Sequence, residues 1–176
     1  MGFVERSGTG RTRTFRLDAA FNDMLEAEAE QQGLSVNNLT ERIIERYINH
    51  TRWIDQIESL TIHPLTIQKI FDELSEEQIM RLGSKLGARV PSESFMMSGM
   101  PLDGVTARYF LERILGEYDH WFSVSYHHSK PYFFLQTSLG DKWLLFVEAY
   151  LKAFYIENLS QEVECIRIEN SLQILL

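Results

Sequence analysis

Cysteine is nearly absent from this chain of 176 residues, since Cys165 is the only one. A single cysteine excludes an intramolecular disulfide framework and any cysteine-rich zinc site. Long apolar runs are missing too, because no stretch approaches the roughly 20 residues that a membrane-spanning helix needs. The first ten residues, MGFVERSGTG, lack the apolar segment of a secretory signal. We therefore expect a cytoplasmic protein that does not contact a membrane.

Catalytic signatures are also missing. The sequence contains no nucleophile elbow and no paired-carboxylate motif, and Gly83, Ser84 and Lys85 lack the glycine spacing of a phosphate-binding loop. We therefore expect that the protein is not an enzyme and needs no cofactor. The chain does contain 44% apolar and 24% charged residues, a balance that predicts one or two folded domains.

Positive charge is scarce in the chain as a whole, where 17 basic and 25 acidic residues give a net charge of −8. The residues up to Arg52 contribute 7 basic and 8 acidic side chains, so the remainder carries −7. Within the first 18 residues the balance is reversed, because four arginines stand against Glu5 and Asp18. A basic N-terminal segment therefore precedes an acidic body, and contacts to phosphate need such a local excess of positive charge.

Residues 11–17 alternate between polar and apolar side chains, as a β-strand with one apolar face does. Thr12, Thr14 and Arg16 share one face, while Phe15 and Leu17 share the other with Arg13. No second strand is predicted nearby to complete the backbone hydrogen bonds of this segment. We therefore expect it to pair, antiparallel, with the same strand of a second subunit.

Two amphipathic helices are predicted after this strand. Asp18 is a suitable N-cap for the first helix, and Gly33 suits the left-handed position that ends it. Ser35 is a suitable N-cap for the second helix, which we expect to reach about His50. Their apolar stripes consist of Phe21, Met24, Leu25 and Ala29 in the first helix and Val36, Leu39, Ile43 and Tyr47 in the second.

This order of strand, capped helix, Gly-Leu-Ser turn and second helix, over residues 11–50, resembles the ribbon-helix-helix repressors of the Arc and methionine-repressor type. The resemblance implies a homodimer, or a higher homo-oligomer, that regulates transcription by placing an intermolecular β-ribbon in the major groove of double-stranded DNA. It implies base contacts from Thr12, Thr14 and Arg16. It implies phosphate contacts from Ser35, Val36 and Asn37 at the start of the second helix, where a positive helix end suits an anion.

Arginine residues complete the predicted DNA contacts. We expect Arg11 and Arg13 to contact phosphates, although Arg13 departs from the family pattern, which usually has an apolar residue at that position. The alternative is an antitoxin or other protein-interaction module that uses the same element mainly for dimerisation. Because toxin-binding tails are usually short and partly disordered, the long and patterned C-terminal region favours the regulator.

Residues 58–176 are predicted to form an acidic α+β domain that oligomerises or senses a ligand. In the first half of this domain we expect a short strand at 59–62, helical segments that end at Gly87 and an irregular stretch at 91–101. A helix at 102–118 and a β-hairpin at 121–137 should follow. The domain should end with a helix from Gly140 or Asp141 and a strand at 163–169 that can extend to Leu176. With one inserted helix, this order matches a split β-α-β, or ferredoxin-like, sandwich.

Two kinds of effector site are open in this domain. His127, His128 and Cys165 are candidate metal ligands, but they lack the usual ligand spacings, and neutral turn histidines with a buried cysteine are the alternative interpretation. Aromatic residues are the other candidate, either as core or as the lining of a small-molecule pocket. They are Trp121, Phe122, Tyr126, Tyr132, Phe133, Phe134, Trp143 and Phe146.

Overall fold

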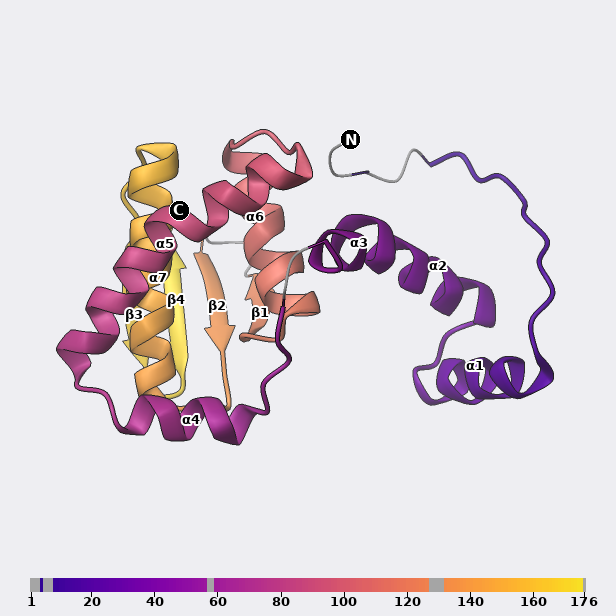
Figure 1. Ribbon diagram of the computed structural model, residues 1–176, viewed down its shortest axis with the longest axis horizontal. Coiled ribbons are helices and arrows are strands. Elements are labelled where there is room, and N and C mark those ends of the chain that lie inside the picture. The colour runs from indigo at the N-terminus through magenta and orange to yellow at the C-terminus, as the bar shows by residue number, and fades with distance from the viewer. Residues whose placement is uncertain (1–3, 5–7, 57–58, 127–131, 176) are drawn as a thin grey trace. The chain divides into compact units, whose positions relative to one another are not determined.

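The computed structural model describes residues 4, 8–56, 59–126 and 132–175. It divides the chain into two compact units, Gly2–Glu58 and Ser59–Leu176, which are treated separately below (Figure 1). Helices and one antiparallel sheet are both present, so the predicted α+β class is confirmed. None of the helices in the described ranges is long and apolar enough to cross a membrane.

The N-terminal unit contains the two helices that the sequence predicts. Helix α1 (Ala19–Gln31) begins at Asp18, whose carboxylate accepts a hydrogen bond of 2.9 Å from the backbone N–H of Ala20. It ends at Gly33, which has a φ of 65°, and the N–H of Leu34 donates to the carbonyl of Ala29. This left-handed residue with its returning hydrogen bond is the usual way in which glycine terminates a helix.

Helix α2 (Val36–Arg46) begins at Ser35, whose hydroxyl accepts a hydrogen bond from the N–H of Asn38 at 3.2 Å. The helix continues without a break into the π-helical turn η1 (Tyr47–Thr51) and then into α3 (Arg52–Ile54). The predicted N-cap is therefore confirmed, and the helical run reaches Ile54, a few residues beyond the expected end near His50.

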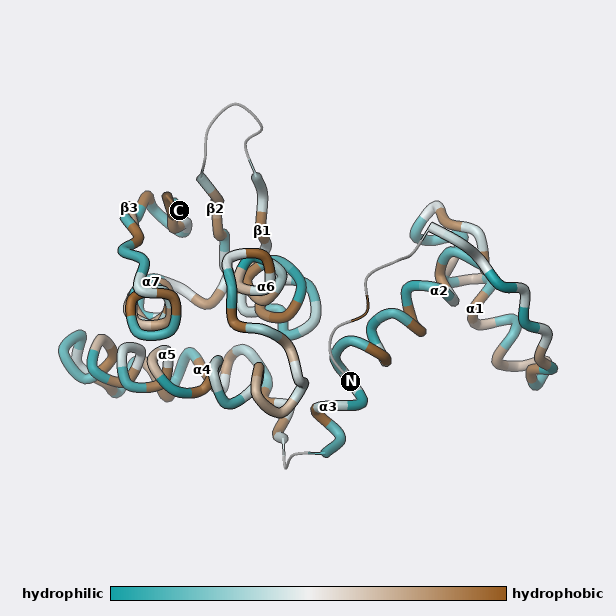
Figure 2. The backbone as a smooth tube through the Cα atoms, turned by 90° about the horizontal axis from the view of Figure 1, so that it is seen from above, coloured by the Kyte–Doolittle hydropathy of each residue, from teal (hydrophilic) through white to brown (hydrophobic). Residues whose placement is uncertain are grey.

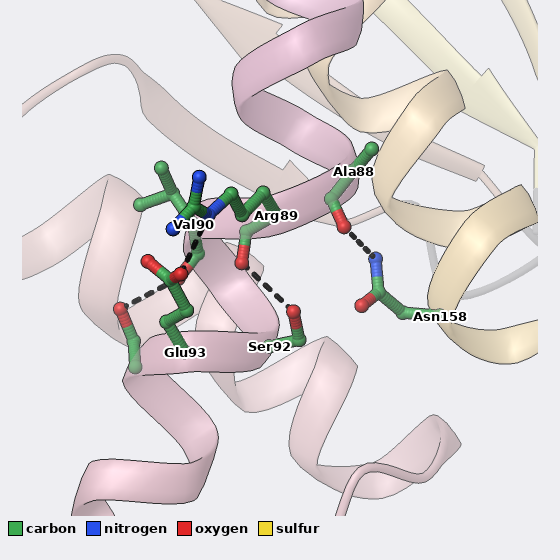
Figure 3. Close-up of polar contacts among 7 residues, drawn as sticks. Ala88, Arg89, Val90, Ser92, Glu93 and Asn158 are labelled. Carbon is green, nitrogen blue, oxygen red and sulfur yellow. Dashed lines mark hydrogen bonds and ion pairs between the residues drawn. The ribbon is translucent and has the colours of Figure 1, made fainter.

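The C-terminal unit begins with α4 (Pro64–Asp72) and the long helix α5 (Glu76–Ser98). The prediction that Gly87 ends a helix and that 91–101 is irregular was wrong, because α5 runs through both Gly87 and Pro91. Pro91 lacks the N–H that would bond within the helix. Two side chains donate hydrogen bonds to backbone carbonyls near Pro91. The amide of Asn158 donates to the carbonyl of Ala88 at 3.4 Å, and the hydroxyl of Ser92 donates to the carbonyl of Arg89 at 2.8 Å (Figure 3).

Glycine has a packing function in α5 that the sequence did not reveal. Helix α7 (Asp141–Leu159) lies so close to α5 that a Cβ atom on Gly87 would stand 2.0 Å from the carbonyl oxygen of Tyr150. A Cβ atom on Gly83 would stand 2.6 Å from the carbonyl oxygen of Phe146. Glycine at these two positions therefore lets the two helix backbones meet, which explains why Gly87 continues the helix.

The remaining helix and the first hairpin follow the prediction. Helix α6 (Gly104–Tyr109) continues as the π-helical segment η2 (Phe110–Tyr118). Strands β1 (Ser123–Tyr126) and β2 (Tyr132–Gln136) then form an antiparallel hairpin. After α7, strands β3 (Glu164–Ile168) and β4 (Ser171–Leu175) form a second hairpin, where the sequence had predicted one strand with an extension.

The sheet has the order β1-β2-β4-β3, with every neighbouring pair antiparallel. Residues 59–62 are not a strand, so the ferredoxin-like arrangement, which needs a strand before the first helix, was wrong. Two hairpins joined by α7 replace it. Hairpins are favoured here because each strand finds its partner within a few residues, whereas a strand at 59–62 would have to cross several helices to reach the sheet.

Helix α7 contributes more residues to the core than any other element described in this unit. Its residues Val147, Leu151 and Phe154 have no more than 1% of their surface exposed. The helix packs against α5 on one side and against the sheet residues Leu135 and Leu172 on the other. Helices therefore cover one face of the sheet, as Figure 2 shows for this unit.

Candidate nucleic-acid interface

The basic segment at residues 11–17 has no regular secondary structure in the single chain. The strand predicted there is not formed, and an N-terminal ribbon is absent from the described part of this unit. The physical reason is that a strand needs a neighbour for its backbone N–H and C=O groups. In this unit the described residues form helices and irregular segments only, so no strand is available as that neighbour.

All side chains of this segment are exposed. Thr12, Thr14 and Arg16, the predicted base contacts, lie on an uncovered stretch of chain together with Arg11 and Arg13. The segment from residue 11 to 17 carries three arginines and no acidic residue, and the next carboxylate, Asp18, accepts the capping hydrogen bond of α1. The three guanidinium groups are therefore placed on a segment with a local charge of +3.

The start of α2 supplies a second group of donors. The first N–H groups of any α-helix have no acceptor within the helix, and here these belong to Val36 and Asn37 after the cap Ser35. No acidic side chain occurs in the first turn. Because the N-terminal end of a helix also carries partial positive charge, this arrangement can accept an anion such as phosphate.

Apolar side chains of the N-terminal unit are exposed to an unusual extent. Phe21 and Met24 of α1 keep 66% and 70% of their surface exposed, Ile43 of α2 keeps 50%, and Tyr47 at the start of η1 keeps 55%. Phe15 and Leu17 of the basic segment are exposed as well. Ala29 and Leu39 are the buried apolar residues among those described in this unit. The predicted apolar stripes therefore pack in part, at Ala29 and Leu39, and their remaining large side chains stay largely uncovered within the unit.

The N-terminal arm has one anchor that the sequence did not suggest. The side-chain amide of Asn49, which is buried, accepts a hydrogen bond from the N–H of Val4 at 3.0 Å and donates one to its carbonyl at 3.2 Å. Asn49 lies in η1, at the far end of the α2 helical run. These two hydrogen bonds hold Val4 of the N-terminal arm against the helical run. An asparagine that pairs with both backbone groups of a distant residue leaves no periodic signal in the sequence.

The candidate metal site is only partly within the described residues. His127 and His128 lie outside them. Cys165 lies on β3 and is partly buried, and burial raises the pKa of its thiol to about 12. A neutral thiol is a poor metal ligand, since metals bind the thiolate. In the ranges that the structure covers, no three His, Cys, Asp or Glu side chains gather in a way that could hold an ion.

The aromatic residues that could have lined a pocket divide into two groups. Trp121, Trp143 and Phe146 pack against one another with ring centroids 5.1 to 5.8 Å apart, and the indole N–H of Trp143 donates to the carbonyl of Trp121. This group, with Phe122 and Phe133, is core. Tyr132 and Phe134 instead belong to the face of the sheet opposite α7.

An open groove of about 580 Å³ lies elsewhere, between α5, α7 and the start of β3. Glu148 on its wall forms ion pairs with Lys152 at 2.7 Å and with Arg167 at 3.1 Å. The hydrogen bond that Lys152 donates to the carboxylate of Glu148 raises the pKa of Lys152. None of the predicted aromatic residues lines this groove.

Comparison with protein-family models, with curated proteins and with solved structures finds no match.

Proposed function

We propose that this protein is a sequence-specific, DNA-binding regulator of transcription that acts as a ribbon-helix-helix homodimer. Residues 11–17 of two chains pair antiparallel, and the ribbon enters the major groove. Thr12, Thr14 and Arg16 then face base edges, because alternate side chains of a strand project to the same side. Arg11 and Arg13, with Ser35, Val36 and Asn37, contact backbone phosphates.

One observation carries this proposal: an unpaired basic segment is directly followed by helices whose apolar stripes are exposed. Phe15 and Leu17 on the segment, Phe21 and Met24 on α1, and Ile43 on α2 all keep more than a third of their surface in contact with solvent. Pairing the segment with a second copy would satisfy its backbone groups and bury these side chains at the same time. In a monomer the backbone groups of the segment rely on water, and the apolar side chains stay exposed.

The alternative, an interaction module of the antitoxin type, is less well supported. Residues 59–176 form a unit with its own continuous core, which includes Leu111, Phe133 and Tyr150. A segment that folds on a partner instead has too few apolar residues for a core of its own. The regulator also accounts for the local charge of +3, which dimerisation alone does not require.

Duplex DNA binding by the full-length protein tests the proposal. We expect affinity to fall steeply with salt, because each neutralised phosphate releases counterions, and selection from random duplexes should yield a preferred, two-fold symmetric sequence. Binding that is absent at low salt, from a protein that is dimeric, would favour the dimerisation module.

Two substitutions separate base contacts from phosphate contacts. Arg16→Ala should cost about 1 to 3 kcal/mol on the preferred sequence and relax the preference, because a bidentate guanine contact is lost. Arg13→Ala should weaken binding to all sequences and reduce the salt dependence. Arg81→Ala, an exposed arginine of α5, is the matched control and should change neither property. Equal losses on every sequence for Arg16→Ala would make Arg16 a phosphate contact.

A further inference from the structure

The four-stranded sheet has one covered and one open face. Directly paired residues project to the same side of an antiparallel sheet, so the register places Phe133, Leu135, Leu172 and Ile174 together on one face. All four are buried by the helices. Of the helices described in this unit, none lies on the other side of the sheet (Figure 2). The second face is therefore not covered by them.

The open face combines aromatic and aliphatic side chains with neutral polar ones. Tyr132 and Phe134 meet edge to face, with ring centroids 5.0 Å apart and an interplanar angle of 89°. Ile166 and Ile168 on β3 keep 41% and 48% of their surface exposed. The face consists of Ser123, Ser125, Tyr132, Phe134, Gln136, Glu164, Ile166, Ile168, Ser171, Gln173 and Leu175.

Charge is depleted on this face compared with the rest of the unit. Residues 59–176 contain 15 acidic and 10 basic residues, which give a net charge of −5. Glu164, at the edge, is the one charged residue of the open face among those that the register assigns. A basic partner would be recognised through complementary acidic groups, and this face does not offer them. Its chemistry fits a partner that is itself neutral and apolar at the point of contact.

We propose that the open face binds the same face of a second copy of this chain. Two bodies of equal negative charge repel each other least where their surfaces carry little charge, and the single carboxylate of this face, Glu164, lies at its edge on both sides of a two-fold axis. Serine and glutamine side chains can both donate and accept hydrogen bonds, so each can bond to the same residue of the second chain. The ring pair and the isoleucines provide the apolar surface that drives association.

The size of the face predicts the strength of the contact. Four strands about 4.8 Å apart and five residues at about 3.4 Å each span roughly 300 Å². That value is below the ~800 Å² per partner of a standard stable interface. We therefore expect association through this face to be weak and reversible, with a dissociation constant on the order of micromolar.

The test measures the mass of the full chain by sedimentation equilibrium in a variant that lacks the proposed N-terminal dimer. Ile43→Glu places a charge in the exposed stripe of α2 and removes that dimer without changing the sheet. In this background we expect a reversible monomer–dimer equilibrium. Adding Gln173→Glu should raise the dissociation constant at least tenfold, because Gln173 lies in the middle of the face, between Phe134 and Ile166.

Two further samples make the result specific. Gln161→Glu, in the loop after α7, adds the same charge away from the face and should leave the equilibrium unchanged. Mixing Gln173→Glu chains with Gln173→Lys chains should restore association, since opposite charges then meet across the axis. Circular dichroism confirms that each variant is folded.

The outcomes are distinct from those of the proposed function. An Ile43→Glu chain that stays monomeric at 100 micromolar, roughly a hundredfold above a micromolar dissociation constant, would overturn the inference, as would Gln173→Glu chains that associate as tightly as the Gln161→Glu control. If the N-terminal ribbon does not dimerise, Ile43→Glu changes nothing and Gln173→Glu alone produces monomers. The inference then stands while the proposed function fails.

Discussion

The two units of this chain differ in where their apolar side chains end up. In the C-terminal unit, α7 buries Val147, Leu151 and Phe154 within a continuous core. In the N-terminal unit, Phe21 and Met24 remain largely exposed although they have the same helical spacing. Amphipathic patterning therefore specifies which face of a helix needs a packing surface, but it does not specify whether the same chain provides that surface. The predictions below test whether one unit is complete alone and the other is not.

The largest effect is expected from a cavity in the complete unit. Phe154→Ala removes a ring that is fully buried between Phe95, Phe110 and Tyr155, and should lower the free energy of unfolding by about 3 to 5 kcal/mol. Denaturation followed by tryptophan fluorescence measures it, because Trp121 and Trp143 lie in this core. Ile156→Ala, on the same helix but 47% exposed, is the control and should cost much less.

The next largest effect is expected where two helix backbones meet. Gly87→Ala would place a methyl group 2.0 Å from the carbonyl oxygen of Tyr150, so α5 and α7 must move apart, at a cost of about 1 to 3 kcal/mol or more. Gly104→Ala, at the start of α6, meets nothing within 4 Å and should be neutral or slightly stabilising. Thermal unfolding of both variants distinguishes these outcomes. Equal stability would show that α5 tolerates displacement.

Dilution should affect the incomplete unit and not the complete one. If α1 and α2 fold only as a dimer, tenfold dilution lowers their apparent stability by about 1.4 kcal/mol. Helical circular dichroism reports this change, while fluorescence from Trp121 and Trp143 should stay constant. The Gln173→Glu background removes the second proposed contact from the measurement. A transition of α1 and α2 that is independent of concentration would contradict the dimer.

A smaller effect is expected at the start of α2, where one substitution should raise stability and weaken DNA binding. Asn37→Asp adds a negative charge near the positive end of the helix and should stabilise it by about 0.3 to 1 kcal/mol. The same charge should weaken DNA binding, because it repels the phosphate that we assign to this helix end. Gain of stability with unchanged DNA affinity would place the phosphate elsewhere.

The smallest effect near neutral pH concerns Cys165. Burial raises the pKa of its thiol to about 12, so the folded state holds this proton more tightly than the unfolded state, whose thiol titrates near 8.5. The resulting stability is complete below the unfolded pKa and is lost as the pH rises from about 9 to 12. Cys165→Ser should reduce this alkaline loss in urea denaturation series. An identical pH profile in the variant would argue that other groups cause the loss.

Local chemistry explains what could be predicted. Asp18, Gly33 and Ser35 define the ends of α1 and α2 because capping depends on a side chain and its nearest backbone groups. The hairpin of β1 and β2 and the start of α7 at Gly140 follow from alternation and turn residues in the same way. The candidate DNA contacts were predicted as positions on a pattern, and their pairing remains a prediction.

The features that could be predicted are therefore those with local causes: the two capped helices, the first hairpin, the apolar character of α7 and the basic charge before residue 19. The continuation of α5 through Gly87 and Pro91 could not be predicted, because α5 packs there against α7, some 60 residues further along the chain. The strand order, the anchor at Asn49 and the open face of the sheet could not be predicted either. These features depend on contacts between distant segments, and such contacts leave no periodic signal in either segment alone.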